Sequence, residues 1–164
     1  LCQVSTTLFR AAMNAGLEIT ERQNHSYRVS YYEPPVGMDA TIYSPRPDFK
    51  FVNNTDSYIL VQGRVEGYNV TFDLYGTKDG RQSFVSEPTV YDITPAGDPI
   101  YKDDPSLPQG EEKVVSKAHQ GAKASFTYKV VKGGKEIINE TFKSVYVSWP
   151  ARILRGTGEP ASQE

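Results

Sequence analysis

Residues 1–16 read LCQVSTTLFRAAMNAG, and this stretch decides how the chain folds. Small and apolar side chains recur in it at spacings of three and four residues, which predicts an amphipathic helix over residues 3–14. Gly16 follows as a natural C-terminal stop. The apolar face is expected to hold Val4, Leu8, Ala11, Ala12 and Ala15. No other stretch predicts a helix with comparable strength, so the remainder should be extended.

The rest of the sequence is typical of a β-rich chain with many turns. It contains eleven Tyr, eleven Pro and thirteen Gly, residues that favour strands or turns. Apolar and polar residues alternate over 68–74, which predicts a half-buried antiparallel strand. A shorter strand is expected over 39–43, between two proline-rich loops. Residues 124–130 and 135–147 predict a hairpin with Gly133-Gly134 as its turn.

The pattern of residues changes near Lys78, and this change divides the chain into two predicted domains. The fold class is α+β: a small mixed domain over 1–78, with one N-terminal helix and antiparallel strands, precedes an elongated all-β module over 79–158. The hairpin of the second domain is expected to supply few large core residues. Residues 96–109, rich in Pro, Asp and Gly, predict a loop, and 159–164 a flexible tail.

Charge and composition argue against several classes of protein. The 18 Lys and Arg nearly balance the 20 Asp and Glu, without the basic stripe that a nucleic-acid surface needs. No apolar run approaches the roughly 18 residues that cross a bilayer, so membrane attachment would need a segment outside this chain. Cys2, His25 and His119 are too few and too scattered for a four-ligand zinc site, and no cofactor is expected.

The only cysteine, Cys2, lies at the start of the predicted helix. Backbone N–H groups at a helix N-terminus favour a thiolate. A helix end contributes about 0.3–1 kcal/mol, whereas one pKa unit corresponds to about 1.4 kcal/mol. The helix alone would therefore lower the thiol pKa by one unit or so at most. A nucleophilic Cys2 would need a second source of stabilisation, for which His25 is the candidate.

Taken alone, these residues also fit a structural interpretation. A single cysteine beside an apolar helix face is more often a small buried hydrophobe than a nucleophile. A histidine next to Ser and Tyr is more often a hydrogen-bonding loop residue than a catalyst, and His119 is expected to be a surface strand residue. The neighbouring tyrosines can stack on sugar rings or flank a peptide groove, but ordinary sheet packing explains them as well.

The first half of the chain resembles the VanW-like family of bacterial envelope proteins. The resemblance covers most of residues 1–75 in the family's order. It is carried by Cys2-Gln3-Val4-Ser5-Thr6-Thr7-Leu8, Asn14-Ala15-Gly16-Leu17-Glu18-Ile19, Arg22-Gln23-Asn24-His25-Ser26, Pro34-Pro35-Val36-Gly37-Met38-Asp39-Ala40-Thr41 and Asp48-Phe49-Lys50-Phe51-Val52-Asn53. The family usually has a glycine run just before the cysteine. Because this chain starts at Leu1, we expect the domain to be truncated at its N-terminus.

The second half resembles a G-five domain, a module named for its glycines that often follows VanW-like domains on bacterial surfaces. The residues that carry it are Asp103-Asp104-Pro105-Ser106-Leu107-Pro108-Gln109-Gly110, Gly121, Tyr128-Lys129-Val130 and Gly134-Lys135-Glu136. The two resemblances imply a cell-envelope protein on the extracytoplasmic face, membrane-anchored or secreted in its full-length form. Peptidoglycan stem peptides or glycan strands are the implied partners.

Some VanW-like domains are implicated as cysteine L,D-transpeptidases, and the resemblance therefore implies an acyltransferase. Cys2 would attack an amide carbonyl of a stem peptide, and a second stem's amine would resolve the thioester. His25 would keep the thiol ionised and move protons, while Ser26 or Asp39 would orient the imidazole.

Five further residues are predicted to contact the substrate. The helix start from Gln3 to Ser5 would offer N–H groups to the developing oxyanion. The groove would be lined by Tyr27, Tyr31 and Tyr32. The alternative function is a non-catalytic module that binds glycan or peptidoglycan and has an inert thiol.

Overall fold

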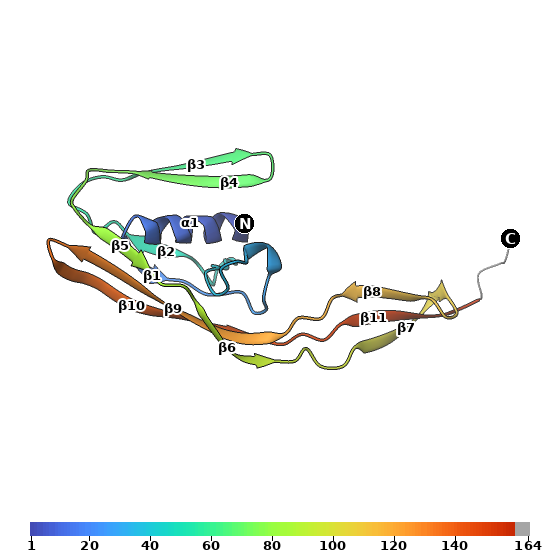
Figure 1. Cartoon of the computed structure of the whole chain (residues 1–164). Coiled ribbons are helices and arrows are strands. Elements are labelled where there is room, and N and C mark those ends of the chain that lie inside the picture. The colour runs from blue at the N-terminus through green and yellow to red at the C-terminus, as the bar shows by residue number, and fades with distance from the viewer. Residues whose placement is uncertain (160–164) are drawn as a thin grey trace. The chain divides into compact units, whose positions relative to one another are not determined.

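The structure is a computed structural model, and it describes residues 1–159. Its elements are α1 (Cys2–Asn14), β1 (Glu18–Glu21), η1 (Ser30–Tyr32), β2 (Lys50–Val52), β3 (Leu60–Glu66), β4 (Asn69–Tyr75), β5 (Gln82–Val85), β6 (Thr89–Thr94), β7 (Ile100–Pro108), β8 (Glu112–Ser116), β9 (Gly121–Lys132), β10 (Lys135–Tyr146) and β11 (Arg152–Gly158). The predicted α+β class, with one N-terminal helix and mostly antiparallel strands, is confirmed (Figure 1). Apart from its first residue, the predicted tail over 159–164 lies outside the described residues. Within the described part, no helix is both long and apolar enough to cross a membrane.

Contacts divide the chain into two compact units, and neither is a continuous segment. Unit 1 comprises Leu1–His25, Val29–Tyr91 and Lys123–Val145. Unit 2 comprises Ser26–Arg28, Asp92–Ala122 and the segment from Tyr146 onward. Unit 1 therefore includes most of the β9–β10 hairpin, which lies far beyond residue 78. The division predicted at residue 78 stays a prediction about sequence domains.

The core of unit 1 is built around Phe9 of α1, whose side chain is fully buried. Its ring meets those of Phe49 and Phe142 edge-on, each at a centroid distance of 5.6 Å, and Phe126 at 6.5 Å. Phe126 and Phe142 come from β9 and β10, so the hairpin packs against the helix. Burying a Phe side chain contributes about 1.5–3 kcal/mol, and favourable ring pairs add about 0.5–1.5 kcal/mol. The helix and the hairpin thus depend on each other for stability.

The predicted helix is present, but its buried face is rotated from the expected one. The residues of α1 that are buried are Ser5, Thr6, Phe9, Ala12 and Met13. Of the expected face only Ala12 is fully buried, and Val4 is 42% exposed. Polar side chains replace the expected apolar ones in the first turn because they find hydrogen-bond partners. The Ser5 and Thr6 hydroxyls both donate to the carbonyl oxygen of Ala40, at 2.6 and 3.2 Å.

The same contacts explain why residues 39–43 do not form the expected strand. The Ala40 N–H donates to the Thr6 hydroxyl at 3.0 Å, so both backbone groups of Ala40 are paired with helix side chains. The Thr41 N–H donates to the Gln23 carbonyl at 2.8 Å. The segment is therefore fixed against α1 and the chain that follows β1, rather than in a ladder of its own.

The expectation that the hairpin supplies few large core residues is wrong. On β9, burial alternates along the strand, and Phe126, Tyr128 and Val130 are all buried. Ile138 of β10 joins them. The Tyr128 hydroxyl donates to the carbonyl oxygen of Leu17 at 2.8 Å, so its buried polar atom is satisfied. The small residues Ala122 and Ala124 lie among these larger ones, which makes the strand look poor in core residues in the sequence.

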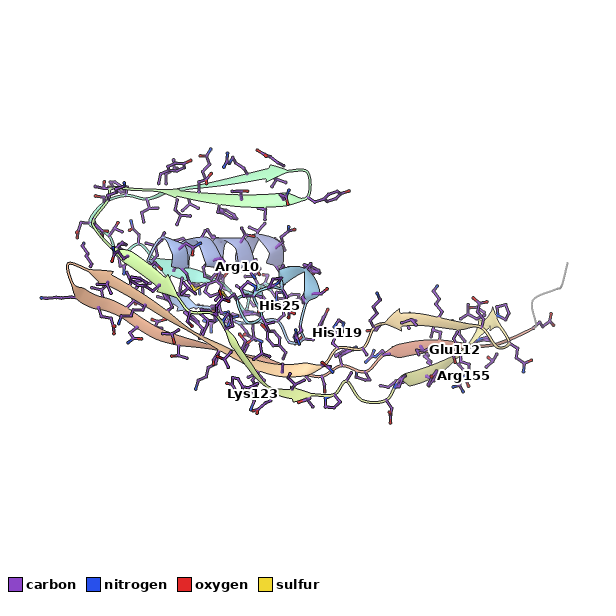
Figure 2. The ribbon with its side chains drawn as sticks, in the orientation of Figure 1. Arg10, His25, Glu112, His119, Lys123 and Arg155 are labelled. Carbon is purple, nitrogen blue, oxygen red and sulfur yellow. The ribbon has the colours of Figure 1, made fainter. Side chains whose placement is uncertain are left out.

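Unit 2 contains a three-stranded sheet in the order β7–β11–β8, and its first strand was expected to be a loop. β7 pairs with β11 in parallel, and β11 pairs with β8 antiparallel. The glycines of β11 allow this pairing, because a Cβ at Gly156 would collide with the carbonyl oxygen of Pro108. Arg155 of β11 lies beside Glu112 of β8, with Nε 4.0 Å from the carboxylate (Figure 2).

Removing the Phe9 ring should test the central role of the helix–hairpin contact. We expect Phe9→Ala to lower the free energy of unfolding by about 3–5 kcal/mol, the usual cost of an aromatic cavity. Val4→Ala on the exposed face of the same helix should change it by less than about 0.5 kcal/mol. Denaturant unfolding monitored by circular dichroism measures both. Equal losses for the two variants would contradict the observed helix face.

Candidate active site

The cysteine thiol lies in the first turn of α1, where the chain enters the helix. The Leu1 carbonyl accepts the N–H groups of Val4 and Ser5 at 2.9 and 3.2 Å, which closes this turn. Cys2 is partly buried, and its Sγ lies 3.6 Å from the Thr41 hydroxyl oxygen. The thiol also lies within 3.8 Å of the Ile42 carbonyl oxygen, to which it can donate. The segment held by Ser5 and Thr6 therefore forms one side of the thiol site.

The imidazole of His25 is held by the Asp39 carboxylate. The His25 Nδ1 lies 2.6 Å from Asp39 Oδ2, and the same oxygen accepts the His25 backbone N–H at 2.7 Å. The ring stacks on Tyr32 with centroids 5.0 Å apart and an interplanar angle of 28°. Because the carboxylate accepts from Nδ1, the other ring nitrogen, Nε2, is free to exchange a proton with a partner.

The Cys2 thiol and the His25 imidazole each shift the pKa of the other. Burial raises the pKa of Cys2, but hydrogen bonding with the Ile42 backbone, with Thr41 and with His25, together with the charge of His25, lowers it to about 7. Burial lowers the pKa of His25, and the hydrogen bonds and negative charges of Asp39 and Cys2 outweigh it and raise the pKa. A thiol with a lowered pKa beside an imidazole with a raised pKa favours a thiolate–imidazolium pair near neutral pH.

The arrangement can therefore carry out nucleophilic chemistry. A thiolate attacks, an imidazolium supplies a proton, and a carboxylate fixes the imidazole, which is the three-part arrangement of cysteine and serine acyl-transfer enzymes. Among the described residues, no group of three or more His, Cys, Asp or Glu side chains is placed to hold a metal ion.

The other residues predicted for catalysis and binding are distributed differently. Ser26 is exposed, and its carbonyl oxygen accepts the Val147 N–H at 2.7 Å. The group that contacts the imidazole is thus Asp39 and not the neighbouring serine. Ser5 is buried, and its hydroxyl donates to the carbonyls of Ala40 and Cys2, so it holds the site together rather than facing a substrate.

Gln3 and the tyrosines take three different positions. The Gln3 side chain is exposed and donates to the Tyr68 carbonyl, between β3 and β4, at 3.3 Å. Tyr32 is buried against His25, whereas Tyr31 is 76% exposed and meets Tyr32 edge-on at 4.5 Å. Tyr27 belongs to unit 2. Of the three tyrosines, Tyr31 is the most exposed, and it is linked to His25 through Tyr32.

A hollow of about 320 Å³ borders the thiol site. Its wall includes Ile42, whose carbonyl oxygen contacts the Cys2 thiol. The other lining residues are Leu1, Tyr43, Ser44, Pro45, Pro47 and Asp48. This mixture of apolar side chains and one carboxylate suits an extended peptide with both apolar and polar parts.

Two residues of the site were missed by the sequence prediction. Thr41 contacts the thiol, and Arg22 contacts Asp39. The sequence carries no signal for Thr41, which only reaches the thiol because its segment is fixed against α1. A lone arginine before the Asn24-His25 pair could have suggested a partner for a nearby carboxylate, but nothing in its spacing singles it out.

A cluster of aromatic and basic side chains lies in unit 2. The Tyr27 ring lies 5.0 Å from His119 and 6.2 Å from Trp149, measured between centroids. The Arg152 guanidinium lies 5.0 Å above the Trp149 ring. Tyr27 and Trp149 are 40% and 37% exposed. His119 and Trp149 also pair through their backbones, each N–H donating to the other's carbonyl at 2.8 Å.

Comparison with known proteins finds two families in the order that the sequence predicts. Residues 1–75 match the family described as VanW like protein, and residues 86–157 match the G5 domain. The chain is 40% identical over 77 residues to the uncharacterized protein YoaR of Bacillus subtilis (strain 168). That match covers 47% of this chain and 25% of YoaR, so the chain spans about a quarter of the length of this relative.

Two solved structures are also similar to this chain. The G5 domain of an IgA1 protease covers 51% of this chain and 100% of its own length, with a TM-score of 0.30 and 15% identity. The HP0197 G5 domain covers 46% of this chain and 97% of its own length, with a TM-score of 0.24 and 18% identity.

The pH dependence of thiol alkylation should report the contact between Cys2 and His25. Iodoacetamide reacts with thiolates, so the rate for the wild-type protein should rise with pH around a midpoint of about 7. His25→Ala removes a hydrogen bond and a positive charge that lower the pKa of Cys2, so we expect the midpoint to move upward by about one unit. The control is His119→Ala, which should leave the midpoint unchanged. A wild-type midpoint above 8.5, the usual thiol value, would contradict the proposed pair.

Proposed function

We propose that this chain, which joins a VanW-like domain to a G5 domain, acts on peptidoglycan by cysteine-dependent acyl transfer of the L,D-transpeptidase type. The two domains together indicate a protein associated with the cell wall. The chemistry rests on one observation: the His25 imidazole, whose hydrogen bonding and charge lower the pKa of Cys2, lies with its Nδ1 2.6 Å from the Asp39 carboxylate. By its position between thiol and carboxylate, the imidazole can move protons during acyl transfer.

The proposed reaction proceeds in two steps. The Cys2 thiol gives its proton to His25 Nε2, and the thiolate attacks an amide carbonyl of a stem peptide. The tetrahedral intermediate collapses as the C–N bond breaks, and His25 returns the proton to the departing amine. A thioester remains on Cys2. The amine of a second stem then attacks this thioester while His25 accepts its proton, and the thiolate leaves as the new amide forms.

The oxyanion of each intermediate would be stabilised by the first turn of α1. The N–H groups of Val4 and Ser5 already donate to the Leu1 carbonyl, so these two are committed. We therefore assign the oxyanion to the N–H of Gln3, which follows the nucleophile directly. The positive end of the helix dipole would add to this stabilisation.

The remaining parts of the proposal follow from the site and the two domains. Stem peptides would bind along the hollow beside Ile42 and past the exposed Tyr31 ring. The protein would work at the extracytoplasmic face of the cell envelope, anchored in the membrane or secreted. Any membrane anchor would lie in a segment outside this chain.

Trapping the acyl-enzyme tests the proposed nucleophile. Incubation with a purified stem peptide should give a thioester adduct at Cys2, detectable by mass spectrometry of the intact protein. Cys2→Ala should abolish the adduct, and Asp39→Asn should slow its formation by about 10²–10⁴-fold, because the imidazole loses its orienting carboxylate.

Ser26→Ala is the matched control for Asp39→Asn. Ser26 is next to His25 in the sequence, but the side chain that contacts the imidazole is that of Asp39. Its rate of adduct formation should equal that of the wild-type protein. An adduct that persists in Cys2→Ala, or cross-linking by the full-length protein that does not change in this variant, would overturn the proposal.

The aromatic cluster of unit 2 favours a second candidate function, binding of cell-wall glycan without catalysis. Exposed Tyr and Trp rings offer flat apolar faces, and the adjacent Arg152 offers hydrogen-bond donors for sugar hydroxyls. This function requires no reactive thiol. Because the cluster contains no residue of unit 1, the two candidate functions can be tested separately.

Sedimentation with insoluble peptidoglycan measures this binding. We expect Trp149→Ala to weaken it about tenfold, since the loss of a stacking ring costs on the order of 1–3 kcal/mol. Tyr101→Ala is the control, because Tyr101 also lies in unit 2 under an arginine but outside the cluster, with Arg155 at 4.5 Å. Cys2→Ala should bind like the wild-type protein. Equal binding by the Trp149 and Tyr101 variants would exclude the cluster as the glycan site.

A further inference from the structure

A buried arginine, Arg22, contacts the Asp39 carboxylate of the thiol site. The side chain of Arg22 is 2% exposed. Its Nε donates to the Asp39 carbonyl at 2.7 Å, and Nη2 donates to the Gly37 carbonyl at 2.7 Å. Nη1 donates to the Ser144 hydroxyl at 3.0 Å. The guanidinium also lies over the Phe9 ring, 5.3 Å from its centroid. A charge buried this deeply needs a compensating partner.

That partner is the Asp39 carboxylate. The Arg22 Nη2 lies 3.4 Å from Asp39 Oδ1, while Asp39 Oδ2 faces His25. The two oxygens of one carboxylate therefore serve two cations when His25 is protonated. The Asp39 side chain is itself 7% exposed, so water screens these interactions only weakly.

A second arginine makes similar backbone contacts. Arg10 of α1 donates from Nε to the Met38 carbonyl at 2.9 Å and from Nη2 to the Tyr32 carbonyl at 2.6 Å. Both arginines thus hold the segment that carries Tyr32 and Asp39, the two residues in contact with His25. Figure 2 shows Arg10 on α1 and His25 on the neighbouring segment.

We propose that Arg22 is a positioning residue of the thiol site, which acts through Asp39 by offsetting part of the negative charge that its carboxylate presents to His25. This inference adds a residue to the proposed acyl-transfer site, and a role for Arg22 in catalysis rests on that proposed function. The groups facing His25 are the Cys2 thiol from α1, the Asp39 carboxylate and the Tyr32 ring. Among these, Asp39 is the group through which Arg22 can act on the imidazole.

The effect of removing Arg22 has a definite sign. Without the guanidinium, the whole negative charge of Asp39 faces the imidazole, so the imidazolium form becomes more stable. Asp39 itself should stay in place, because its Oδ2 still accepts the His25 backbone N–H. An opposite charge in direct contact shifts a pKa by about 1–3 units. Because Arg22 acts at one remove, we expect the pKa of His25 to rise by about 0.5–1 unit in Arg22→Gln.

Proton NMR of the imidazole C–H signals measures this change directly. The chain has only two histidines, His25 and His119, and His119→Gln identifies the second signal. The readout needs no substrate. If acyl transfer is never found, the titration still decides whether Arg22 acts on His25, so the two proposals can fail independently.

Arg10→Gln is the matched control, since it removes the other arginine that bonds to the same segment and leaves the Arg22–Asp39 ion pair in place. It should destabilise the protein and leave the His25 midpoint within 0.2 unit of the wild-type value, a margin set by the expected shift. Arg22→Lys keeps the positive charge but cannot make all the hydrogen bonds of the guanidinium. The His25 midpoint in this variant should therefore lie between those of the wild-type protein and Arg22→Gln.

Three outcomes would overturn the proposal. They are a His25 midpoint in Arg22→Gln that is unchanged or lower, an equal rise in Arg10→Gln, and, if Arg22→Gln does not fold, an Arg22→Lys variant whose His25 midpoint lies below that of the wild-type protein. A rise confined to the Arg22 variants supports it.

Discussion

The packing of Phe9 between the β9–β10 hairpin and Phe49 is the contact on which unit 1 depends. A helix of 13 residues is marginal on its own, so tertiary contacts must hold it in place. Once Phe9 fixes the helix, Ser5 and Thr6 face Ala40. The Ser5 hydroxyl donates to the Ala40 carbonyl, and the Thr6 hydroxyl accepts the Ala40 N–H. Asp39 precedes Ala40 and Thr41 follows it. The same helix that carries the thiol therefore also places the carboxylate and the hydroxyl beside it.

The sequence predicted the helix, its start beside the cysteine and the order of the two resembling segments, because these depend on local patterns and on motifs. It did not predict which face of the helix is buried. Ser5 and Thr6 are buried because of partners more than thirty residues away, and no local pattern records that pairing. The contribution of the hairpin to the core was underestimated for a related reason. The alanines of β9 make the strand look poor in large residues, although its aromatic residues are buried against α1.

The candidate site shows the same limit. Cys2, His25 and Asp39 were all named from the sequence, and the structure brings them together. The sequence left Ser26 and Asp39 as alternatives for orienting the imidazole, and Asp39, fourteen residues from His25, is the one that contacts the ring. Arg22 lies only three residues before His25, but its role depends on where Asp39 lies. Tyr27 was grouped with Tyr31 and Tyr32, although its ring packs with His119 and Trp149 in the other unit.

The energy supplied by a helix end, compared with that of one pKa unit, indicates why the Cys2 thiol needs further partners to ionise. A helix end supplies about 0.3–1 kcal/mol, less than one pKa unit, and burial opposes ionisation. A pKa of about 7 for Cys2 therefore requires the additional hydrogen bonds and the charge of His25. The imidazolium in turn needs Asp39, whose buried carboxylate is balanced by the permanent charge of Arg22 while the imidazole is neutral. Thiolate, imidazolium, carboxylate and guanidinium alternate in sign and sum to zero, so the reactive pair can form in a largely buried site without leaving a net charge there.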